Sequence, residues 1–157
     1  MDIFDRHLAR EDLTTTLTAW RDILQGEREM EAGRFASAEE HFARVASNHA
    51  ATPIVRGNAY FRRADVQEKQ GRLAESEIAI RDAEDAVRLL ADTQALALRA
   101  EILGTHGFMA SRAGKSLAAE TLTNLGKRAC DELLAAASQP EGLGIRDPEA
   151  AAVAHIG

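Results

Sequence analysis

Apolar side chains recur along this chain with the spacing of helical faces. Between residues 12 and 32 they fall three or four positions apart, at Leu13, Leu17, Trp20 and Leu24, which places them on one side of a helix. Similar patterns predict helices over 35–48, 53–69, 73–92, 94–112 and 116–137, and a short one over 2–9. Aromatic residues, which favour strands together with β-branched ones, make up only 4% of the chain. The sequence therefore predicts an all-α fold.

Glycine follows three of these predicted helices, at Gly33, Gly71 and Gly114. A residue in the left-handed conformation commonly ends a helix, and glycine adopts that conformation at the lowest cost. We therefore expect Gly33 and Gly71 to occupy equivalent left-handed bends. Thr52 and Pro53 suit the N-cap and the first position of another helix. The six long helices then pair as three antiparallel hairpins.

A phrase in the sequence is repeated around these glycines. AGRFASAEEHF at 32–42 and QGRLAESEIAI at 70–80 both have glycine, arginine, a bulky apolar residue and alanine in succession. In both, glutamate stands six residues after the glycine and an apolar residue nine after it. A third copy, GKSLAAETLT at 114–123, keeps the glycine, a basic residue (Lys115) and the glutamate (Glu120). Repetition of this kind indicates a structural repeat.

The three copies resemble the tetratricopeptide repeat family. In that family small residues stand at the eighth and twentieth positions and a large apolar residue at the twenty-fourth. Counted in the same way, this chain has Gly26, Ala64 and Gly107, then Ala38, Ser76 and Ala119, then Phe42, Ile80 and Thr123. Its repeats are longer than the usual period of about 34 residues. The resemblance implies that antiparallel hairpins stack as a short right-handed α-solenoid over residues 12–137, after an N-terminal segment of residues 1–11.

The end of the chain differs from the rest. Residues 138–157 form a C-terminal tail that begins with the proline- and glycine-rich stretch QPEGLGIRDP, which ends any helix. A last short helix beginning near Asp147 and a tail without one both remain open.

The resemblance also implies a binding face. In the family the first helix of each hairpin lines a concave groove that holds a protein or peptide. The matching positions here include Trp20, Glu27, Asn58, Phe61, Arg62, Asp65, Lys69, Phe108 and Arg112. We expect Phe61 and Phe108 to be exposed beside the two arginines and to suit a peptide with apolar and acidic groups. We expect the acidic residues of the fourth helix, Glu75, Asp82, Asp85 and Asp92, to form a solvated outer surface.

Charge and composition narrow the function further. The chain of 157 residues has a net charge of −6, which disfavours nucleic acid and anionic membranes as partners. Neither a signal peptide nor a run of 18 apolar residues occurs, so we expect a cytoplasmic protein. The alanine- and arginine-rich composition suggests a bacterial one.

Candidate chemistry is sparse. The histidines are scattered, none is preceded by glutamate three residues earlier, and no HExxH occurs. The sequence AGKS at 113–116 lacks the earlier glycine of a phosphate-binding loop, and Cys130 is expected to be buried as a small apolar group. We therefore predict a non-catalytic interaction module without metal or cofactor. Two alternatives are a helical enzyme or phosphotransfer protein that uses His106 or His41, and a self-assembling protein whose end hairpins stack between chains.

Overall fold

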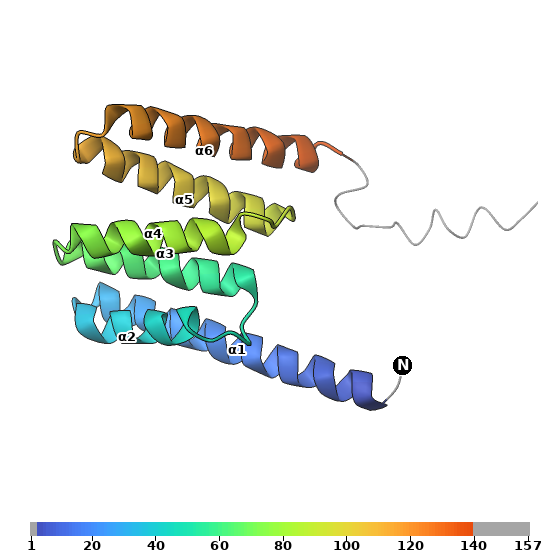
Figure 1. Ribbon diagram of the computed structural model, residues 1–157. Coiled ribbons are helices and arrows are strands. Elements are labelled where there is room, and N and C mark those ends of the chain that lie inside the picture. Colours follow the sequence, from blue (N-terminus) through green and yellow to red (C-terminus); the bar gives the residue numbers. More distant parts are fainter. Residues whose placement is uncertain (1–2, 140–157) are drawn as a thin grey trace, which may run out of the picture.

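The computed structural model describes residues 3–139, and all regular structure in this range is helical. Consecutive helices pack as three antiparallel hairpins that follow one another in chain order (Figure 1). The prediction of an all-α fold is confirmed. The helices are α1 (Ile3–Glu31), α2 (Phe35–Ala46), α3 (Pro53–Lys69), α4 (Leu73–Val87), α5 (Thr93–Arg112) and α6 (Ser116–Ala137).

Two helix boundaries differ from the prediction. The helices expected over 2–9 and 12–32 form one continuous helix, α1, because no glycine or proline interrupts the residues between them. Helix α4 ends at Val87, and the Asp92 side chain accepts a hydrogen bond from the N–H of Ala95 at 3.0 Å. Asp92 is thus the N-cap of α5 and not part of an acidic outer surface. The stretch near Asp147, for which a short helix and a tail without one were both left open, lies outside the described residues.

The three glycine bends have the same geometry. The φ angles of Gly33, Gly71 and Gly114 are 73°, 75° and 72°. After each glycine the next residue donates its N–H to a carbonyl in the last turn of the helix, as Arg72 does to Gln67 at 2.8 Å. This is the Schellman arrangement, and all three bends lie at the same end of the hairpins (Figure 1). The predicted equivalence of Gly33 and Gly71 is confirmed and extends to Gly114.

Small residues let the two helices of a hairpin approach closely. A Cβ atom added to Gly26 would lie 2.7 Å from Phe42 Cε1, and one added to Gly107 would lie 2.9 Å from Thr123 Oγ1. In the second hairpin the buried hydroxyl of Ser76 donates to the carbonyl of Ala64 at 2.7 Å. Positions eight and twenty-four of the repeat therefore meet in the first and third hairpins.

Two clusters of buried residues form the core. The first joins the hairpin of α1 and α2 to α3 and includes Phe42, Val45 and Val55. The second joins the hairpin of α3 and α4 to α5 and includes Ile80 and Ile102. Each cluster thus spans the junction between two successive hairpins.

Candidate partner-binding face

The first helices of the hairpins share one side of the molecule, because α1 contacts α3 and α3 contacts α5. We call this the α1/α3/α5 face. Trp20, Leu24, Lys69, Phe108 and Arg112 are exposed on it, whereas the remaining members are half-buried. It comprises Trp20, Leu24, Glu27, Asn58, Arg62, Asp65, Lys69, Phe108 and Arg112.

The expected exposure of Phe61 is wrong. Only 7% of this residue is accessible, and it packs in the core with Ala64, Ile80 and Ile102. Its side chain faces α4 and α5, and the Arg62 guanidinium lies 5.9 Å from the ring centroid. Phe61 therefore packs beneath the α1/α3/α5 face and is not available to contact a bound partner.

Phe108 does lie at the surface, with 61% of the residue exposed. The Arg112 guanidinium is 5.8 Å from its ring centroid, within the range of a cation–π contact. Arg112 also donates to Glu68 of α3 at 2.7 Å. Sequence reasoning missed Glu68, although its position three residues after Asp65 indicated that it lies near the face.

Charges on the face are mostly paired with one another. Arg62 Nε lies 3.1 Å from Glu27 Oε1 across α3 and α1, and Lys69 lies 2.6 Å from Asp65. Two polar atoms here are nevertheless buried without a hydrogen-bond partner in the described structure, Asn58 Oδ1 and Arg62 Nε. The Arg62–Glu27 contact is thus an ion pair whose orientation is poor for a hydrogen bond.

The glutamate and the basic residue of the repeated phrase join successive hairpins. Glu39 accepts one hydrogen bond from Arg72 in the next hairpin, and Glu77 accepts two from Lys115, each at 3.0 Å. Burial opposes ionisation of Glu39, but hydrogen bonds from Arg72, Gln67 and Arg63 outweigh it and lower the pKa. The hydrogen bond from Lys115 lowers the pKa of Glu77. These recurring residues are structural.

A hollow of about 140 Å³ lies between the ends of α3, α4 and α5. His106 lines it and is 8% exposed, and its Nδ1 lies 2.5 Å from Oε1 of Glu84 on α4. His41 similarly contacts Asp22, at 3.3 Å. Within residues 3–139, no hydroxyl or thiol is hydrogen-bonded to either ring. The two histidines are therefore accounted for as links between helices.

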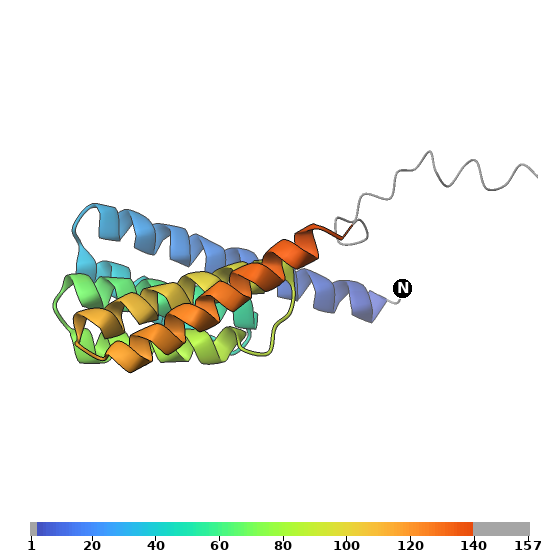
Figure 2. The ribbon, with the colours of Figure 1, turned by 90° about the horizontal axis from the view of Figure 1, so that it is seen from above.

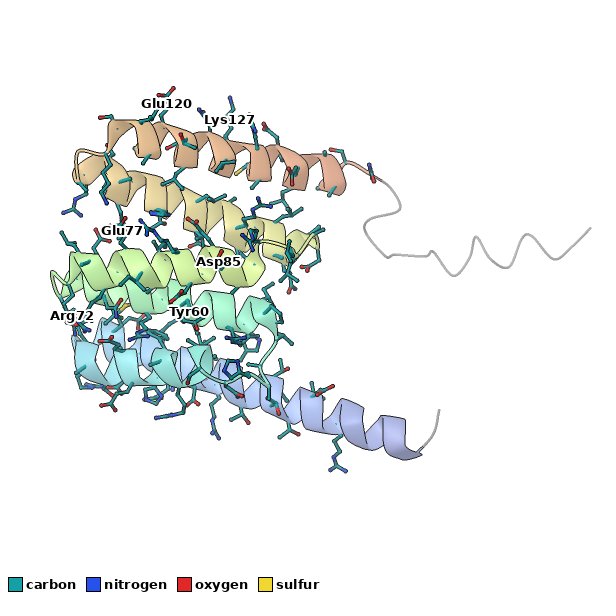
Figure 3. All side chains as sticks on the ribbon, in the orientation of Figure 1. Tyr60, Arg72, Glu77, Asp85, Glu120 and Lys127 are labelled. Atoms are coloured by element: carbon teal, nitrogen blue, oxygen red, sulfur yellow. The ribbon has the colours of Figure 1, made fainter. Side chains whose placement is uncertain are left out.

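Cys130 is exposed, so the expectation that it is buried is wrong. It lies on α6, the last described helix, and no further helix covers the side of α6 that faces away from the stack. Glu120 and Lys127 also point away there (Figure 3). The Cys130 side chain is therefore exposed to solvent because it lies on the last described helix of the stack.

No family model, curated protein or solved structure matches this chain. None of the described helices has the length and apolar character needed to cross a membrane. Across the same residues, no group of three or more histidine, cysteine, aspartate or glutamate side chains is arranged to hold a metal ion.

Proposed function

We propose that this protein is a non-catalytic protein-binding module built from three tetratricopeptide-like hairpins stacked as a short right-handed α-solenoid. Three features support this architecture. The three glycine bends have nearly equal φ angles. Gly26 meets Phe42 in the first hairpin and Gly107 meets Thr123 in the third. A glutamate and a basic residue at matching positions join each hairpin to the next. The proposed setting, a bacterial cytoplasm in which the module serves as adaptor, chaperone or regulator, rests on composition.

The observation that carries the binding proposal is the exposed phenylalanine beside an arginine. Phe108 is 61% exposed and Arg112 stands over its ring, on the face that also presents Trp20 and Leu24. Aromatic and arginine side chains contribute much of the energy at protein interfaces. The ligand that fits is an extended peptide with an apolar side chain for Phe108 and a carboxylate for Arg112.

A library of random peptides displayed on phage tests this proposal. Enriched peptides would be synthesised and their dissociation constants measured by calorimetry. We expect at least one apolar and acidic peptide to bind wild type and to bind about tenfold more weakly to Phe108→Ala. Because Phe108 is exposed, the circular dichroism of this variant should be unchanged.

The control is Asp82→Ala, on the acidic outer surface of α4, which should bind the peptide like wild type. Peptides that bind Phe108→Ala and wild type equally would refute the assigned face. Failure to enrich any peptide that depends on Phe108 or Arg112 would refute the proposed ligand class.

A further inference from the structure

Helix α1 exposes a continuous stripe of large apolar side chains. Leu13, Leu17, Trp20 and Leu24 are 58%, 60%, 36% and 56% accessible. Helix α1 has 29 residues whereas α2 has 12, and both views show its N-terminal half extending beyond the other helices of the first two hairpins (Figures 1 and 2). The face of α1 that packs inward is a different one, with Ala19, Ile23 and Gly26. Exposed apolar surface of this kind marks an interaction site.

Opposite charges stand at the two ends of this stripe. Arg10 precedes Leu13 by three residues, and Glu27 follows Leu24 by three. Steps of three and four residues keep all six side chains on one side of the helix. The α1 seam, defined as Arg10, Leu13, Leu17, Trp20, Leu24 and Glu27, is therefore basic, then apolar, then acidic.

We propose that two copies of this protein associate through antiparallel pairing of their α1 seams. Antiparallel pairing places Leu13 opposite Leu24 of the second copy and Leu17 opposite Trp20. It also places Arg10 of each copy opposite Glu27 of the other. The same surface contacts itself, as a two-fold symmetric interface requires.

Charge decides the direction of this pairing. In a parallel pair each Arg10 would face Arg10 and each Glu27 would face Glu27, and like charges at facing positions are destabilising. Glu27 already contacts Arg62 at 3.1 Å, but its side chain remains 31% exposed, and a carboxylate accepts from more than one cation. Only the antiparallel arrangement places opposite charges, Arg10 and Glu27, face to face at both ends of the seam.

This association differs from stacking through the end hairpins. The outer side of α6 presents Glu120 and Lys127 (Figure 3), both exposed and polar, which suits the end of a stack. The α1 seam overlaps the α1/α3/α5 face only at Trp20, Leu24 and Glu27. Leu17 and Arg10 belong to the seam alone, whereas Phe108 and Arg112 belong to the face alone, so the two proposals can be tested apart.

Sedimentation and light scattering over a range of concentrations test the association. Wild type should have twice the chain mass, and Leu17→Glu should be monomeric with unchanged helicity because Leu17 is 60% exposed. Leu134→Glu, at an exposed leucine of α6, should remain dimeric. Trp20 is the only tryptophan, so dilution should shift its emission to longer wavelength. A wild type that is monomeric at every concentration would overturn the proposal.

Disulfide cross-linking tests the direction. In a Cys130→Ser background, a mixture of Leu13→Cys and Leu24→Cys chains should form a disulfide-linked heterodimer. Neither variant alone should do so, since the two positions lie about 16 Å apart along the helix. Cross-linking of Leu13→Cys to itself would overturn the antiparallel pairing. A Leu17→Glu monomer that still binds peptide through Phe108 would separate this interface from the proposed function.

Discussion

The two junctions between hairpins use the same positions but differ in how tightly they close. At the first, Glu39 is 15% exposed in its side chain and is held by Arg63, Gln67 and Arg72. At the second, the equivalent Glu77 is 30% exposed and is held by Lys115 and Arg81. The hollow of about 140 Å³ adjoins the second carboxylate.

Residues on the helix that follows each glutamate explain this difference. Four residues before the glycine, α3 has Gln67 and α5 has Ala110. The Gln67 side chain donates to Glu39 at 2.8 Å, whereas the methyl group of Ala110 lines the hollow. A shared backbone repeat thus sets where the carboxylate lies, and the side chain opposite determines how closely it is held.

The largest effect should come from Phe42, the fully buried residue of the first junction. Phe42→Ala leaves a cavity and should lower the free energy of unfolding by about 3–5 kcal/mol. The matched control is Thr123→Ala, at the equivalent exposed position of the third hairpin, with a change within about 0.5 kcal/mol. Urea unfolding measures both. Equal losses would show that the two positions are packed alike.

Removing the carboxylate should lower the free energy of unfolding more at the first junction than at the second. Glu39→Ala removes the acceptor of Arg63 and of the Gln67 amide, and leaves Arg72 with Glu75 and Gln70. We expect it to cost about 2 kcal/mol. Glu77→Ala, at the more open site, should cost less than about 1 kcal/mol. The same urea titration measures the pair. A larger loss of stability for Glu77→Ala would contradict the conclusion that the carboxylate beside the hollow is held less tightly than Glu39.

The bends should respond equally, although the junctions do not. Gly71→Val and Gly33→Val each force a β-branched residue to positive φ and should cost on the order of 1 kcal/mol or more. Thermal unfolding checks the two variants. If Gly71→Val is as stable as wild type, the positive φ angle at this bend does not require glycine, and the prediction is wrong.

Acid should weaken both junctions, and the first one more. The folded-state pKa values of Glu39 and Glu77 are lowered, and Arg34 lowers that of Glu29 from 4.5 to about 2. A lowered pKa stabilises the fold above the unfolded value, and this stabilisation is lost as the pH falls toward the folded value. We expect stability to fall from about pH 4.5 downward, with a flatter profile in Glu39→Gln than in Glu77→Gln. Similar slopes in the two variants would contradict this.

The smallest effect should come from copying the first junction into the second. Ala110→Gln places a carboxamide beside Glu77 and fills part of the hollow, so it should stabilise the fold by roughly 0.5–1 kcal/mol. Chemical denaturation measures the gain. A loss of stability would mean that the hollow does not admit the longer side chain.

Local features of the fold were predictable from the sequence. Gly71 ends a helix because of its own conformational freedom, and Pro53 begins one because its φ angle suits the first turn. The large residue at Phe42 was identified by its place in a repeated phrase, and the small one at Gly26 by the position that the family resemblance gives it. Each of these depends on neighbours along the chain or on repetition, both of which are visible without a structure.

Which helical face meets a neighbour was decided by the tertiary structure. The periodicity of α1 identified the stripe from Leu13 to Leu24, yet α2 and α3 pack against the face of Ile23 and leave that stripe exposed. Phe61 is buried because α4 and α5 cover it, and Cys130 is exposed because no described helix covers α6 on that side. The pairing of Glu39 with Arg72 joins residues of different hairpins. Periodicity defines faces relative to a helix's own axis, whereas burial and pairing depend on the helices placed around it.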